Sequence, residues 1–190
     1  MKKIAIYIVL FFPIVACSQV KNVRLIIGGG SSLHGTGDLK GYSFLNQVEL
    51  KLKNNFFLSS GLQLTNNSQR SNLTYFSLNY VTAGANIFAN INYSVINRNR
   101  HQVAIGAGPL LRFQNSSVPS EVGTNLSSSG EQILFIKYDK LRTISIGYNI
   151  SPSYYYQLSQ KVSLGAKFIL QNDTNSDMLT SELVFVGFKL

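Results

Sequence analysis

Over most of its length the chain alternates apolar and small polar residues, and this period of two constrains the fold more than any other feature. A typical segment runs from Val162 to Gln171, where Val162, Leu164, Ala166, Phe168 and Leu170 alternate with Ser163, Gly165, Lys167, Ile169 and Gln171. A β-strand places successive side chains on opposite faces, so this segment has one apolar and one mainly polar face. The sequence therefore predicts an all-β fold.

Eight segments carry this pattern. They are residues 20–30, 42–53, 56–65, 81–95, 102–114, 143–151, 162–171 and 179–190. Short connectors at 53–55, 97–101 and 157–161 alternate with longer stretches rich in Ser, Asn, Gly and Thr, at 31–41, 66–72, 115–131 and 172–178. Short turns on one side and long loops on the other are typical of outer-membrane barrels. We therefore expect an eight-stranded antiparallel up-and-down transmembrane β-barrel with both termini in the periplasm.

The composition indicates that the apolar face of each strand meets lipid. Charged residues make up 13% of the chain, about half of the roughly 25% found in soluble domains. The polar face is mostly Gly, Ser, Thr, Asn and Gln, which fit the narrow interior of an eight-stranded barrel. A soluble calycin-like barrel would instead bury its apolar face and need charge outside. It remains the alternative fold, in the form of a periplasmic lipoprotein that binds a ligand.

Aromatic residues gather near the predicted strand ends. Near the short connectors or the terminus these are Phe56, Phe57, Tyr93, Tyr154, Tyr155, Tyr156 and Phe188, and toward the long loops Tyr42, Phe44, Tyr75, Phe76, Tyr80, Phe113 and Phe168. Membrane barrels carry a girdle of aromatic side chains at each lipid interface. We therefore expect two such girdles.

The first residues have the pattern of an export signal. Lys2 and Lys3 precede an apolar run from Ile4 to Ala16, which as a helix spans about 20 Å and is too short for a bilayer core of roughly 30 Å. We expect residues 1–18 to be a signal peptide and residues 19–190 to be the barrel domain. Cleavage after Ser18 and a lipobox that ends at a lipidated Cys17 both remain open.

Five charged residues fall on the predicted inward face of the strands. They are Arg24, Glu49, Lys51, Arg112 and Lys167. An isolated buried charge costs several kcal/mol, so we expect these residues to form a charge cluster in the lumen. Arg24 and Glu49 fall on the first two strands near the same end, and we expect them to pair and to help close a lumen without a wide pore.

The C-terminal segment resembles a family signature. Val184, Val186, Phe188 and Leu190 alternate along the last strand, as in the terminal strand by which outer-membrane barrels are recognised for assembly, although that strand usually ends in an aromatic residue. The Gly-rich segment 104–109 is also similar to a strand of OmpA- or OmpX-type barrels. The resemblance implies an integral outer-membrane protein with a structural or surface-interaction role and no cofactor.

The same resemblance and the charge of the chain suggest the partners. The resemblance implies contact with outer-membrane lipids, recognition of the last strand by the barrel-assembly machinery and an extracellular partner on the loops. The net charge of +9 suits a neighbourhood of anionic lipopolysaccharide. The basic residues are not interleaved with aromatics as in a nucleic-acid groove, so we expect no nucleic-acid partner.

The two histidines of the chain raise a catalytic alternative. His34 lies between Ser31 and Asp38, and some small barrels that acylate or deacylate lipid A place such groups at the outer rim. We expect no enzyme, and keep a lipid A-modifying enzyme that uses His34 as the alternative. His101 falls in a basic turn beside Arg98 and Arg100, and we expect it to be solvated near lipid headgroups.

Overall fold

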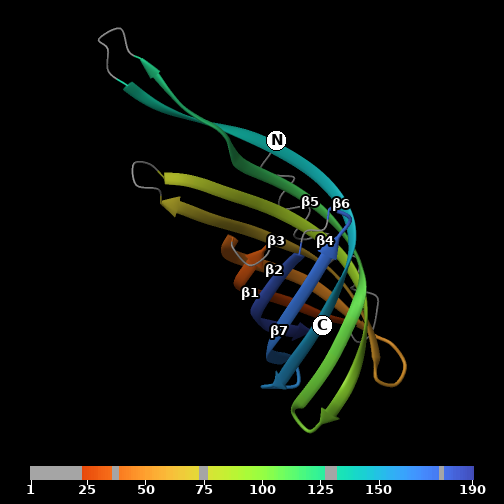
Figure 1. The fold of residues 1–190 in the computed structure, drawn as a ribbon. Helices are drawn as coiled ribbons and strands as arrows, with labels where there is room; N and C mark the ends of the chain where they lie inside the picture. Colours follow the sequence, from red (N-terminus) through yellow and green to blue (C-terminus); the bar gives the residue numbers. More distant parts are fainter. Residues whose placement is uncertain (1–22, 36–38, 73–76, 127–131, 176–177) are drawn as a thin grey trace, which may run out of the picture.

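The computed structural model describes residues 23–35, 39–72, 77–126, 132–175 and 178–190, and these form a barrel of eight strands (Figure 1). The strands are β1 (Val23–His34), β2 (Leu39–Lys51), β3 (Phe56–Asn72), β4 (Ser77–Arg98), β5 (His101–Leu126), β6 (Gln132–Gln157), β7 (Val162–Asp173) and β8 (Met178–Lys189). Each strand pairs antiparallel with its neighbours in sequence, and β1 pairs with β8 to close the ring. The predicted eight-stranded antiparallel barrel is confirmed.

The predicted orientation of the two faces is also confirmed. Ile105, Ile146 and Leu164 lie on the outer wall with 50%, 64% and 42% of their surface exposed. Ser145, their polar counterpart, is 3% exposed and faces the lumen. The apolar half of each strand therefore forms the outside of the barrel.

The two ends of the barrel differ in the length of their connections. At the short-turn end, residues 52–55, 99–100 and 158–161 join β2 to β3, β4 to β5 and β6 to β7. Asn54 and Asn99 adopt positive φ angles of 57° and 52° in the first two turns, a conformation that Asn tolerates better than most residues. We call the opposite end the hairpin end.

Three of the predicted long loops are mostly extensions of the strands. Residues 66–72 belong to β3, and most of 115–131 belongs to β5, which runs to Leu126. The segment 31–41 is likewise mostly strand, since β1 ends at His34 and β2 begins at Leu39. The prediction was wrong here because these segments are mostly polar on both faces, so apolar alternation disappears although the backbone ladder continues and Ser32, His34 and Asn67 are buried inside the barrel.

The extended hairpins rise beyond the closed ring. Figure 1 shows the β5–β6 hairpin (green and teal) reaching furthest, with the β3–β4 hairpin (yellow) beside it. The pairing between β4 and β5 begins at Val81 and Ser117, so β5 beyond Ser117 pairs with β6 alone. These hairpins present a long, two-stranded surface at the hairpin end, on which polar residues alternate with exposed apolar ones such as Val122 and Phe135.

The interior is less polar than the alternation predicts. Every strand contributes to a cluster of buried apolar side chains inside the barrel: Ile26, Leu45, Phe57, Phe88, Ala104, Leu110, Tyr155, Ile169, Leu183 and Phe185. Inward-facing Gly61 and Gly165 make room for the large rings, because an added Cβ there would meet Phe88 and Phe185. This packing fills the lumen and leaves no wide pore through the described residues.

The expectation of aromatic girdles is wrong for two residues. Phe57 and Tyr155 are 6% and 2% exposed and lie inside the barrel, whereas Phe56 and Tyr154 are 45% and 40% exposed on the wall. Consecutive residues of a strand point to opposite faces, so a run of aromatic residues must place one of them inside.

The packing of the barrel can be tested at Gly108, where β5 and β4 approach one another closely. A Cβ at Gly108 would clash with the backbone oxygen of Ala89 on β4. We expect Gly108→Ala to lower the free energy of unfolding by about 1–3 kcal/mol, measured by urea titration of the refolded barrel. Gly29→Ala is the matched control, because its nearest neighbour would be the Ser43 oxygen at 3.6 Å. Equal stability of the two variants would contradict the close approach.

Candidate functional site: the barrel lumen

A charged cluster lies in the lumen at the short-turn end. Arg24 and Glu49 are direct cross-strand partners on β1 and β2, and Arg24 Nη1 lies 3.3 Å from Glu49 Oε2. The Tyr155 hydroxyl donates a 2.6 Å hydrogen bond to Glu49 Oε1, and the Arg24 guanidinium lies 4.8 Å from the centre of the Tyr155 ring. Three strands therefore hold one carboxylate, which is itself 3% exposed.

Lys167 joins this cluster through an amide. Its ammonium donates a 2.7 Å hydrogen bond to Gln47 Oε1, and Gln47 Nε2 donates a 2.8 Å bond to Glu49 Oε1. Lys167 is 2% exposed. The glutamine thus links a buried cation on β7 to the carboxylate on β2, because it can accept a bond at one atom and donate at another.

A second cluster lies closer to the hairpin end, around Arg112. The guanidinium donates to Asp173 Oδ2 at 2.9 Å, to Gln171 Oε1 at 3.2 Å and to Asn86 Oδ1 at 3.2 Å. Ser145 donates a further 2.7 Å bond to Asp173 Oδ2. The side chains of Arg112 and Asp173 are 1% and 0% exposed, so this ion pair is enclosed within the barrel.

Amide side chains extend the Arg112 cluster across the lumen. Gln171 Nε2 donates to Gln63 Oε1 at 2.7 Å, and Gln63 Nε2 donates to Ser43 Oγ at 2.7 Å and to Ser181 Oγ at 2.9 Å. Buried polar groups are costly when unpaired. The network pairs these four side chains by linking β2, β3, β7 and β8 across the lumen.

The other predicted site residues lie elsewhere. Lys51 follows Glu49 on the inward face but is exposed, and it lines the mouth of the barrel instead of the enclosed lumen. His34 is 6% exposed inside the hairpin end, with Nε2 at 3.2 Å from Gln114 Oε1. His101 is exposed at a short turn and lies 2.7 Å from the Tyr154 hydroxyl. Cys17 and residues 1–18 fall outside the described residues.

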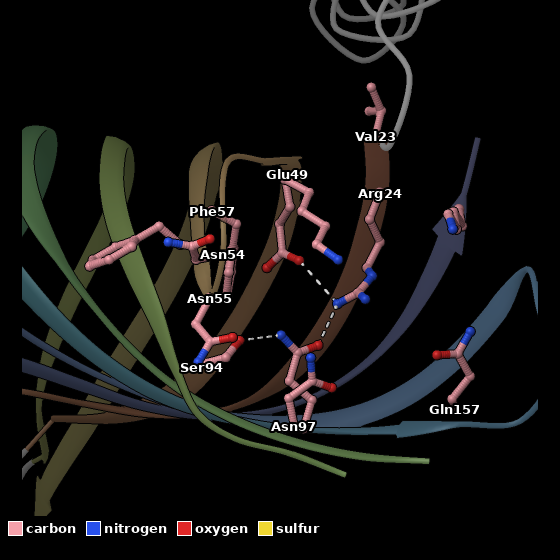
Figure 2. A pocket seen from close by; sticks show the side chains of 13 residues that line it. Val23, Arg24, Glu49, Asn54, Asn55, Phe57, Ser94, Asn97 and Gln157 are labelled. Atoms are coloured by element: carbon pink, nitrogen blue, oxygen red, sulfur yellow. Dashed lines mark hydrogen bonds and ion pairs between the residues drawn. The ribbon is translucent and has the colours of Figure 1, made fainter. Parts of the chain in front are cut away.

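The mouth at the short-turn end holds a pocket of about 200 Å³. Its lining is mostly polar: Val23, Arg24, Glu49, Lys51, Asn54, Asn55, Phe56, Phe57, Ser94, Asn97, Gln102, Gln157 and Lys189. Figure 2 shows Arg24 and Glu49 pointing toward one another across it, with Ser94 and Asn97 on the opposite side. The Arg24–Glu49 pair therefore forms part of the wall of the pocket.

Neither a metal centre nor a membrane-spanning helix is found in the part of the chain that the structure describes. Those residues contain no group of three His, Cys, Asp or Glu side chains placed to bind a metal ion. They also contain no helix of the length and apolarity needed to cross a bilayer.

Sequence reasoning missed several members of the two clusters. Asp173 was placed in a loop, although it continues the inward series of β7 through Lys167 and Gln171. Tyr155 was placed in a girdle, and Gln47 was not singled out. Strand parity could have found all three, but only the closed ring shows which inward residues from distant strands meet.

Removing the charge of Glu49 tests the cluster. We expect Glu49→Gln to lower the free energy of unfolding by about 1–3 kcal/mol, because Arg24 and Lys167 would lose their shared carboxylate in a largely buried site. The measurement is urea unfolding in detergent or vesicles. Glu121→Gln is the matched control, since its pair with Lys137 has both side chains more than half exposed and is expected to contribute under about 1 kcal/mol. Equal unfolding midpoints would argue against the cluster's role in stability.

Comparison with known proteins shows likeness at the level of fold. No family model and no curated protein sequence matches the chain. Among solved structures, Ail, the attachment invasion locus protein of Yersinia pestis, matches with a TM-score of 0.53 at 6% identity, over 90% of this chain and 100% of that one. Neisserial surface protein A matches with a TM-score of 0.54 at 14% identity, over 89% and 96%.

A third structure extends the same likeness. A major outer membrane protein from Thermus thermophilus matches with a TM-score of 0.54 at 11% identity, over 88% of this chain and 99% of that one. Each match spans nearly the whole of both chains while few residues are shared. The chain therefore has the fold of the small outer-membrane β-barrels.

Proposed function

We propose that the protein is an integral outer-membrane β-barrel with a structural or surface-interaction role. The observation that carries this proposal is that the barrel has an apolar outer wall and a buried polar network inside, the reverse of a soluble barrel. The exposed wall residues include Ile27, Phe44, Leu58, Leu64, Ile87, Ile91, Ile105, Ile144, Ile150, Leu164, Phe168 and Val184. A wall of this kind around a whole ring far exceeds the apolar patches that soluble monomers expose.

The closed ring supports a location in lipid for a second reason. A bilayer core offers no water to unpaired backbone groups, so a sheet can cross it only as a closed barrel. Here β1 pairs with β8 from Arg24–Lys189 to His34–Leu179, which removes the edges that an open sheet would leave. In this proposal the short turns lie in the periplasm and the long hairpins lie outside the cell.

Charges on the outward face favour contact with anionic lipopolysaccharide. Lys40, Arg70, Lys140 and Arg142 are exposed at outward-facing positions near the hairpin end, where the headgroups of the outer leaflet would lie. Glu182 is an outward carboxylate on β8 in the same region. The surplus of cations attracts phosphate-bearing lipid. The alternating terminal strand supports recognition by the barrel-assembly machinery, and the β5–β6 hairpin offers a surface for an extracellular partner.

The two alternatives have less support. His34 is buried inside the barrel beside Gln114, away from the outer wall that acyl chains of lipid A would contact, so a lipid-modifying role is not favoured. A calycin-like lipoprotein needs an apolar cavity. The pocket formed by the described residues is lined mostly by polar side chains, and the apolar residues of the interior pack against one another.

Membrane fractionation combined with a heat-modifiability gel tests the proposal. We expect the protein in the outer-membrane fraction, and we expect the unheated sample to migrate faster in SDS than the boiled one, because the closed barrel resists SDS until heated. Recovery of the mature protein as a soluble species without detergent, with no heat-dependent shift, would favour the lipoprotein alternative.

A charge on the outer wall tests the contact with lipid directly. Ile150 lies on the outward face of β6, seven residues from its end at Gln157. We expect Ile150→Arg to lower the free energy of unfolding in vesicles by about 2–4 kcal/mol, the cost of an arginine near the bilayer midplane.

Ile136→Arg is the matched control on the same face of the same strand. Ile136 pairs with Val122 in the hairpin beyond the ring, where water replaces lipid, and its cost should stay near about 0.5 kcal/mol. Equal costs at both positions would contradict a lipid-facing wall.

A further inference from the structure

We propose that the pocket at the short-turn mouth binds a small, soluble phosphate monoester that carries hydroxyl groups, such as a phosphorylated polyol or sugar. The proposal rests on the charge, the donor geometry and the size of this pocket, which the barrel fold itself does not require. The proposed site is the open mouth at the short-turn end, outside the enclosed hydrogen-bond network of the lumen.

The charge of the pocket matches a dianion. Its lining carries three cations, Arg24, Lys51 and Lys189, against one carboxylate, Glu49. Among the described residues, neither lysine has an ion-pair partner, and Glu49 is already engaged by Arg24, Gln47 and Tyr155. The surplus is therefore two positive charges, and a phosphate monoester carries about −1.5 to −2 at neutral pH.

The register of the strands places these cations next to one another. Arg24 on β1 pairs directly with Lys189 on β8 and with Glu49 on β2, and Lys51 follows Glu49 on the same face. Cβ atoms of such direct cross-strand partners lie about 4.5–5.5 Å apart. One anion in the pocket can thus contact cations contributed by three adjacent strands.

Arg24 keeps donors available for such a ligand. Its hydrogen bonds to Glu49 and Gln102, at 3.3 and 3.5 Å, both come from Nη1. Nε and Nη2 form no hydrogen bond with any other described residue, and a quarter of the side chain is exposed. A guanidinium has five N–H donors in a planar fork, which suits two oxygens of one phosphate group.

The remaining lining suits a small polar molecule. Five amides line the pocket, and they belong to Asn54, Asn55, Asn97, Gln102 and Gln157. Gln102 already bonds to Ser94 and Arg24, and the Gln157 amide nitrogen bonds to two turn carbonyls. An asparagine amide can donate to and accept from hydroxyl groups. The volume of about 200 Å³ is below the roughly 300–1,000 Å³ of sites for drug-sized ligands. This size fits a phosphate with a few attached carbons.

The position of the pocket favours a free molecule over a lipid headgroup. Arg24, Glu49, Lys51, Ser94 and Gln102 all lie on the inward face of their strands, so the pocket opens along the barrel axis. A lipid in the bilayer would contact the outward face instead.

Calorimetric titration of the refolded full-length protein in nonionic detergent at low ionic strength tests the site, with glycerol 2-phosphate as the probe and glycerol as the uncharged comparison. We expect saturable binding of the phosphate alone. Lys51→Gln and Lys189→Gln should each weaken binding by about three- to fivefold, the upper part of the range for an exposed ion pair, and the double variant should weaken it by about the product of the two effects.

Lys161→Gln is the matched control, because Lys161 lies in the turn at the same end but does not line the pocket. Its affinity should stay within about twofold of the unchanged protein. Equal weakening in all three single variants would mean that diffuse charge at the rim attracts the anion, and would overturn the proposal. Absence of binding, or displacement of the probe by phosphatidylglycerol in nanodiscs, would overturn it as well. A heat-modifiability gel of each variant verifies that the barrel has formed.

Discussion

The pairing of β1 with β8 is the interaction on which the rest of this structure depends. Without it, two strands of 12 residues each would expose their backbone groups, which a bilayer cannot solvate. With it, every strand has two neighbours around the ring, and the apolar face of each is free to point outward. Closure also fixes the diameter, and a ring of eight strands leaves only enough interior space for side chains. The apolar outer wall and the filled interior of the barrel are therefore both consequences of the β1–β8 pairing.

Closure of the ring confines polar side chains to the interior, where they must find hydrogen-bond partners. Polar side chains that a soluble protein would hydrate are here confined to a narrow lumen, where an unpaired group costs about 1–3 kcal/mol. The molecule meets this cost with two charged clusters that each include amide side chains. Apolar side chains fill the rest of the interior, where large rings pack against inward-facing glycines. Glu49 is central to one cluster and Arg112 to the other. The two ends are distinct, since the short-turn mouth is cationic and open while the hairpin end continues into extended two-stranded hairpins.

Strand parity predicted a large part of this arrangement and failed where its assumption failed. It gave the number of strands, the short turns and the inward face of Arg24, Glu49, Arg112 and Lys167. It lost β5 beyond residue 114, because a hairpin in water on both faces needs no alternation. It also treated Phe57 and Tyr155 as members of a girdle, although their direct neighbours Phe56 and Tyr154 already occupied the outer face. Both errors come from using residue type as the criterion, although the position of a residue along its strand decides which face its side chain occupies.

The sequence by itself determined the fold class and the face on which most residues of the alternating segments lie, because the period of two is a local property of an extended backbone. Only the tertiary structure decided which inward residues meet. Lys167 and Gln47 are 120 positions apart, and Tyr155 and Glu49 are 106 apart. Such contacts depend on the register of every strand pair and on the closure of the ring, because together these decide which residues of distant strands lie at the same height in the lumen. No local sequence pattern contains this information. The lumen network and the pocket at its mouth could therefore be recognised only in the closed barrel.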